Sequence, residues 1–60
     1  MIQITKWLEP NEDTWYQGAY ITVYEWLIIE KERLAKITKK KVVIKTDSKG
    51  NKAIFREKLK

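Results

Sequence analysis

The side chains of this chain that could do chemistry are mainly cationic, and they are concentrated in its last third. From Thr38 to Lys60, lysines and one arginine alternate with apolar residues on both sides of a polar stretch. Cationic side chains in such an arrangement bind phosphate groups by charge. The segment is therefore typical of a protein that contacts a polyanion, and duplex DNA is the obvious candidate.

The element that must position these cations is a β-hairpin. The polar stretch Asp47–Asn51 contains aspartate, serine, glycine and asparagine, which favour turns and tolerate the positive φ angles that hairpin loops need. We expect the apolar residues to anchor one face of the hairpin and the cations to stay in solvent. The apolar set is Val42, Ile44, Ala53 and Phe55, and the cationic set is Lys45, Lys52 and Arg56.

The candidate nucleic-acid-binding residues are all basic. They are Lys39, Lys40, Lys41, Lys45, Lys49, Lys52 and Arg56. The first three would contact phosphates, the next three would follow the DNA backbone along the ribbon, and Arg56 could reach a base edge or the minor groove. The alternative is that the lysines only keep a small protein soluble and protect the edges of the hairpin from pairing with other strands.

The charge of the chain is unevenly distributed. Thirteen basic and eight acidic residues give a net charge of +5, and residues 36–60 hold ten of the basic residues but only two of the acidic ones. This asymmetry indicates one end that faces a polyanion and another end with a different use.

The composition argues against an enzyme and against a metal site. Cysteine and histidine are both absent, so the chain lacks disulfides, the usual ligands of zinc and iron, the commonest general base and the readiest thiol nucleophile. The only serine, Ser48, has no histidine to activate it. The carboxylates of Glu9, Glu12 and Asp13 surround Pro10 and Asn11, a pattern typical of a solvated loop. We therefore predict a non-enzymatic protein without a metal or another cofactor.

We expect one soluble domain spanning residues 1–60. A chain of this length can bury only a small core. Its longest apolar run, Trp26–Ile29, is far shorter than the roughly 20 residues that span a membrane, and the chain does not open with a signal-peptide pattern. These features predict a cytoplasmic protein without a membrane partner.

The preceding residues predict a strand and then a helix. Met1–Leu8 alternates as a strand does, Pro10 ends it, Glu9–Thr14 reads as a polar loop, and Gly18 marks a second break. Thr22 with Glu25 fits a capping box. The helix, over about Thr22–Ile37, would turn a stripe of Val23, Leu27, Leu34 and Ile37 to the core.

The predicted fold is thus a small α+β domain with an N-terminal strand, one helix and a C-terminal basic hairpin, similar to a winged helix. An alternative remains for Tyr20–Ile29, which is rich in β-branched and aromatic residues. If this segment were a strand, it would pair with the hairpin and the domain would be a small all-β barrel.

The apolar residues of the predicted helix extend beyond one face. Ile28 and Ile29 project towards flanks that should be polar, so either the N-terminal strand and the region of Trp7 and Trp15 cover them, or they form a patch for self-association or a protein partner. The candidate protein-interaction residues are Trp7, Trp15, Tyr20, Trp26 and Ile29. They define the alternative function, a small phage-type protein that binds and modulates a host protein.

Two segments resemble a known family. The run Tyr-Ile-Thr-Val-Tyr-Glu-Trp at residues 20–26 resembles the opening of the phage lambda excisionase type, and residues 50–57 are similar to the second strand of its wing. The resemblance implies a small basic winged-helix protein of a phage or mobile element. Members of this family bind and bend DNA at attachment sites and direct a site-specific recombinase towards excision. We therefore expect an accessory factor of recombination or transcription.

The chain also departs from this family. Too few residues lie between Trp26 and the hairpin for a separate recognition helix, and Met1–Ala19 has no counterpart in the resemblance. If the chain binds DNA, these departures place the contact mainly on the hairpin.

Overall fold

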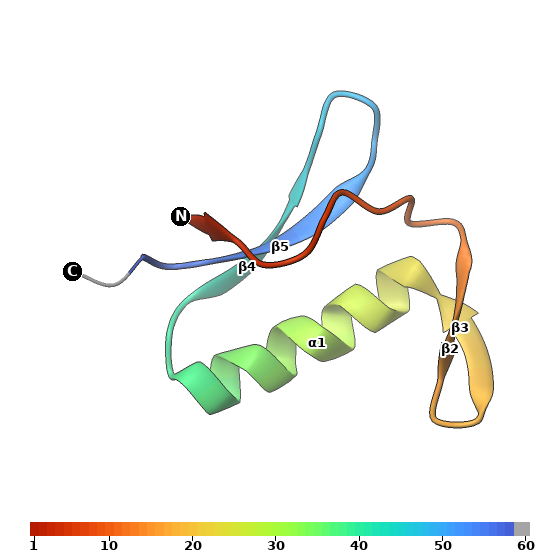
Figure 1. Cartoon of the computed structure of the whole chain (residues 1–60), viewed down its shortest axis with the longest axis horizontal. Coiled ribbons are helices and arrows are strands. Elements are labelled where there is room, and N and C mark those ends of the chain that lie inside the picture. Colours follow the sequence, from red (N-terminus) through yellow and green to blue (C-terminus); the bar gives the residue numbers. More distant parts are fainter. Residues whose placement is uncertain (59–60) are drawn as a thin grey trace.

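One helix lies against one face of a small antiparallel sheet, and a separate two-stranded hairpin adjoins the start of the helix (Figure 1). This computed structural model describes residues 1–58. The elements in chain order are β1 (Ile2–Gln3), β2 (Asp13–Tyr16), β3 (Ala19–Thr22), α1 (Val23–Thr38), β4 (Val42–Thr46) and β5 (Lys52–Arg56). The predicted α+β architecture is confirmed. The barrel alternative is wrong, because the sheet β1–β5–β4 is open and most of the ambiguous segment is helical.

The helix begins where the sequence predicts, because its first amide groups find acceptors. The Thr22 hydroxyl accepts a hydrogen bond from the Glu25 amide at 3.2 Å, as an N-cap does. The preceding loop satisfies two more amides, since Val23 donates to the Glu12 carbonyl at 2.7 Å and Tyr24 donates to the Pro10 carbonyl at 3.2 Å. Only the threonine half of the predicted capping box forms within residues 1–58.

The core lies between α1 and the sheet. Val23 and Leu27 from the helix meet Val42 and Ile54 from the sheet, and partly buried residues surround them. The predicted stripe is wrong for Ile37, which is 63% exposed. Ten residues separate Leu27 from Ile37, and at about 100° per residue this spacing turns Ile37 roughly 80° away from the core direction.

Strand pairing corrects the predicted faces of the hairpin. Val42 pairs with Arg56, Ile44 with Ile54 and Lys45 with Ala53. Directly paired residues of antiparallel strands lie on the same face. Ala53 and Phe55 therefore lie on the other face of the sheet from Val42 and Ile44, contrary to the prediction. The reason is the turn of five residues, which pairs even-numbered residues of β4 with even-numbered residues of β5.

The N-terminal segment is a strand over a shorter range than predicted. Ile2–Gln3 pairs with β5, the Ile4 amide donates to the Ile54 carbonyl at 2.8 Å, and pairing resumes only at Leu8, opposite Lys52. Between them the backbone leaves the ladder, and the Thr5 hydroxyl accepts the hydrogen bond of the Ile54 amide at 3.0 Å. β5 is therefore the central strand, and β4 is an outer strand.

A second hairpin, formed by β2 and β3, was not predicted from the sequence. It includes Asp13 and Thr14, which the sequence suggested were loop residues. Its two-residue turn is Gln17–Gly18, with φ angles of 48° and 86°. Two positive φ angles are typical of the type I′ turn, whose twist suits a tight hairpin.

Candidate nucleic-acid interface

The face of the sheet that α1 leaves uncovered, called the open face below, combines a cation with aromatic rings. By strand pairing it carries Gln3, Val43, Lys45, Ala53 and Phe55. The Trp7 ring lies 5.6 Å from the Phe55 ring between centroids, and the Lys45 Nζ atom lies 5.0 Å from the Phe55 centroid. The lysine stem is thus held on an aromatic surface while its side chain remains exposed.

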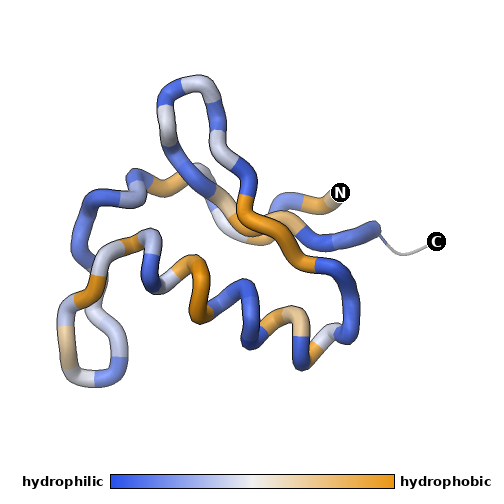
Figure 2. The backbone as a smooth tube through the Cα atoms, turned by 180° about the vertical axis from the view of Figure 1, so that it is seen from behind, coloured by the Kyte–Doolittle hydropathy of each residue, from blue (hydrophilic) through white to orange (hydrophobic). Residues whose placement is uncertain are grey.

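Five lysines lie in β4 or in the segments directly before and after it. These residues, called the β4 lysines below, are Lys39, Lys40, Lys41, Lys45 and Lys49. Alternation along the strand places Lys41 on the same face as Lys45, roughly 13 Å away. In Figure 2 the apolar stretch of β4 lies between hydrophilic segments at its two ends. The outer strand therefore carries cations before, within and after its apolar part.

The backbone around the first three β4 lysines is fixed by hydrogen bonds. Lys39 has a left-handed conformation, with φ 56°, and its amide donates to the Ala35 carbonyl at 3.0 Å. The Lys40 amide donates to the Thr38 hydroxyl at 3.3 Å, and the Lys41 carbonyl accepts from the Glu57 amide at 2.9 Å. Only the side chains of these lysines remain to be oriented by a ligand.

The turn at the other end of β4 has the conformation that its composition predicts. One carboxylate oxygen of Asp47 accepts hydrogen bonds from the amides of Lys49 at 2.8 Å and Asn51 at 2.9 Å. Gly50 has φ 87°, which glycine adopts readily. The only acidic side chain in the turn is thus bonded to the backbone, while the Lys49 side chain is exposed.

Two predicted DNA contacts, Lys52 and Arg56, lie apart from the β4 lysines. Strand pairing places both on the side of the sheet that faces α1, and both are half-buried rather than free in solvent. The Lys52 Nζ atom donates to the Thr46 hydroxyl at 2.7 Å and lies 5.5 Å from the Tyr24 ring centroid. The structure therefore places five of the seven predicted residues in β4 or beside its ends and separates two.

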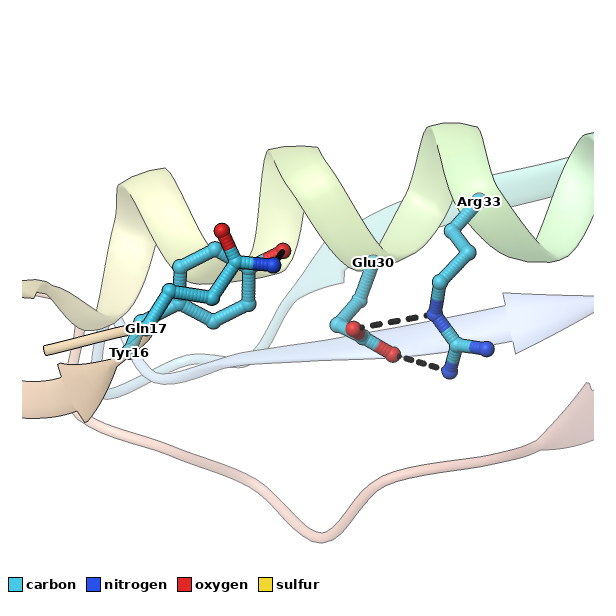
Figure 3. Close-up of polar contacts among 4 residues, drawn as sticks. All are labelled: Tyr16, Gln17, Glu30 and Arg33. Carbon is cyan, nitrogen blue, oxygen red and sulfur yellow. Dashed lines mark hydrogen bonds and ion pairs between the residues drawn. The ribbon is translucent and has the colours of Figure 1, made fainter.

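Glu30 and Arg33 of α1 form the one ion pair that is found within residues 1–58 (Figure 3). The guanidinium donates two hydrogen bonds to the carboxylate, at 3.1 and 2.6 Å. This bonding raises the pKa of Arg33 above its ordinary value. Arg33 is thus locally neutralised, whereas the β4 lysines make no ion pair in the described part of the chain.

The residues of the alternative, a protein-interaction patch, do not form one surface. Trp7 lies against Phe55, whereas Trp15 and Tyr20 face each other across the β2–β3 hairpin. Trp26 packs against the core, and Ile29, 36% exposed, lies on the helix side opposite Leu27. The N-terminal strand pairs with β5 and does not contact α1, so the alternative in which this strand covers Ile29 is wrong.

No pocket and no cluster of three or more possible metal ligands is found in residues 1–58. The helix of this region is too short and too polar to cross a membrane. Comparison with known proteins found no matching family model, curated protein or solved structure. The likeness to excisionases thus stays a prediction that depends on two short segments.

Proposed function

We propose that this protein is a non-enzymatic DNA-binding protein that contacts duplex DNA along β4. The observation that carries the proposal is the set of β4 lysines, which lie before, within and after the outer strand and form no ion pair within residues 1–58. Lysine side chains bind phosphates as point charges without reading base sequence. Binding would therefore be largely electrostatic.

The surroundings of β4 favour phosphate contacts over a merely solvated strand. Val42–Thr46 contains no acidic residue, and the Asp47 carboxylate is bonded within the turn. Glu57, whose amide donates to the Lys41 carbonyl, forms no ion pair with a β4 lysine within residues 1–58. The excisionase resemblance implies a more specific role for the same hairpin, as the wing of a recombination accessory factor. That role belongs to the proposal and depends on DNA binding.

The salt dependence of binding tests the proposal. With a fluorescently labelled duplex, five phosphate contacts should give a log–log slope of about −4.5 in an anisotropy titration at several salt concentrations. The double variant Lys45→Ala, Lys49→Ala should reduce the steepness of this slope by about 2 units. The matched control Lys31→Ala, Lys36→Ala removes the same charge from α1 and should leave the slope nearly unchanged.

Three results would contradict the proposal. If both double variants weaken binding equally, only net charge matters and β4 is not the site. If a single-stranded oligonucleotide of the same sequence binds more tightly than the duplex, then the exposed Trp7, which like Lys45 lies close to the Phe55 ring, points to base stacking instead. If no DNA binds even at low salt, the lysines only protect an outer strand.

A further inference from the structure

Trp15 and Tyr20 are unusually exposed for aromatic side chains. They pair directly across the β2–β3 hairpin, with an edge-to-face arrangement and 5.1 Å between ring centroids. This pairing supports the hairpin. It still leaves Trp15 61% and Tyr20 71% exposed, so most of their surface faces water. Exposed tryptophan and tyrosine side chains are typical anchors of protein interfaces.

Acidic side chains lie on the face that carries this aromatic pair and next to it. Asp13 lies on the same face of the hairpin as Trp15, because side chains two residues apart share a face. Glu25 lies in the first turn of α1, where its amide donates to the hydroxyl of Thr22, the residue that pairs with Asp13; both acidic side chains are exposed. The outer face of the hairpin is therefore both aromatic and negatively charged.

Acidic and basic residues are also separated along the sequence of the whole chain. Residues 7–30 contain five acidic residues and no lysine or arginine, a net charge of −5, whereas the other residues contain thirteen basic and three acidic ones, a net charge of +10. The β2–β3 hairpin lies at the N-terminal end of α1, and Lys39–Lys41 follow its C-terminal end (Figure 1). A helix of 16 residues, about 24 Å long, separates them.

This charge decides which kind of ligand suits the aromatic pair. Carboxylates beside exposed rings repel the phosphates of a nucleic acid, so the pair does not suit base stacking. Arginine, in contrast, stacks on Trp and Tyr rings and forms bidentate pairs with carboxylates. We propose that the outer face of the β2–β3 hairpin docks an arginine-rich segment of a protein partner.

The test uses a synthetic peptide that alternates arginine with glycine and serine, compared with a glutamate peptide of the same length. In an NMR titration, the indole N–H signal of Trp15 should shift with the arginine peptide and that of Trp7 should not. By calorimetry, Trp15→Ala and Tyr20→Ala should each weaken binding about tenfold. The control Ile37→Ala removes an apolar side chain of similar exposure at the other end of the helix and should leave the affinity unchanged.

A shift of the Trp7 or Trp26 indole signals in place of that of Trp15 would overturn the proposal, as would equal affinity for the glutamate peptide. Asp13→Asn provides a second variant that keeps the size of the side chain and both rings. It should weaken binding several-fold and make binding less sensitive to salt, and an unchanged affinity would contradict the proposal even if Trp15→Ala unfolds the hairpin. These outcomes are independent of DNA binding, because the β4 lysines lie outside this hairpin.

Discussion

Thr22 lies at the junction of β3 and α1 and contributes to the structure of both. It is the last residue of β3, where it pairs with Asp13, and its extended backbone, with φ −70° and ψ 152°, is that of an N-cap. Thr22→Ala removes the oxygen that accepts from the Glu25 amide. We expect a loss of about 1 kcal/mol of unfolding free energy and a fall in melting temperature of several degrees.

Two further substitutions at Thr22 separate the cap from the strand. Thr22→Ser keeps the hydroxyl and should melt close to the wild type, whereas Thr22→Val keeps the β-branched shape and should melt like the alanine variant. If Thr22→Val is as stable as the wild type, the carbonyls of Glu12 and Pro10 suffice to begin the helix.

Lys39 has a backbone conformation that a residue with a side chain adopts at a cost. Its φ of 56° is in the left-handed region, where helices commonly end with glycine. Lys39→Gly and Lys39→Ala remove the same charge, but only glycine relieves the strain. We expect the glycine variant to be more stable than the alanine variant by about 1 kcal/mol in urea unfolding. Equal stability would mean that the helix end relaxes into another conformation.

At the scale of elements, the helix presents opposite faces to the core and to water. Leu27 is fully buried, and Ile29, two residues later, lies on the opposite side. Ile29→Lys should therefore change the unfolding free energy by no more than about 0.5 kcal/mol. Leu27→Lys, which buries a charge in the core, should unfold the protein. Circular dichroism with urea titration measures both, and unfolding by Ile29→Lys would mean that Ile29 is covered.

The sequence predicts the helix and the C-terminal hairpin because their signals are local. A cap, a 3.6-residue period and a turn rich in aspartate and glycine act within a few residues. The faces of the hairpin could not be predicted in this way, because Val42–Ile44 and Ala53–Phe55 are each three consecutive apolar residues. Without alternation, the length of the turn sets which side chains face α1.

The same limit applies to the candidate site. The β4 lysines are close together in the sequence, within one strand or beside its ends, so sequence reasoning places them together. The position of Lys52 and Arg56 on the helix side depends on pairing, which composition does not reveal. The β2–β3 hairpin did have a signal, two strand-like runs separated by exactly two residues, but Gln17–Gly18 is a less typical turn pair than Asn-Gly or Asp-Gly.

At the scale of the whole molecule, the small thickness of the domain limits the size of its hydrophobic core. The Cα atoms extend over 37 × 29 × 12 Å, and five residues of the described chain are buried. With one helix on one small sheet, most side chains reach water, and ten large hydrophobic residues are exposed within residues 1–58. The reserve of stability should be small, since short chains bury a modest fraction of their surface.

Because the free energy of unfolding is small, ligand binding should be measurable as a gain in stability. A ligand that binds only the folded state raises the unfolding free energy. At a duplex concentration of one hundred times Kd, the gain should be about 2.7 kcal/mol, which corresponds to a rise in melting temperature on the order of 10 °C or more. Without DNA, the double variant Lys45→Ala, Lys49→Ala should melt like the wild type, since both side chains are exposed. At the same DNA concentration its melting temperature should rise much less.

The control Lys31→Ala, Lys36→Ala should gain nearly as much stability from DNA as the wild type. Differential scanning fluorimetry with a dye that does not bind DNA measures these shifts, and raising the salt concentration should reduce the gain of the wild type. Equal gains for the two double variants would place the DNA contact away from β4.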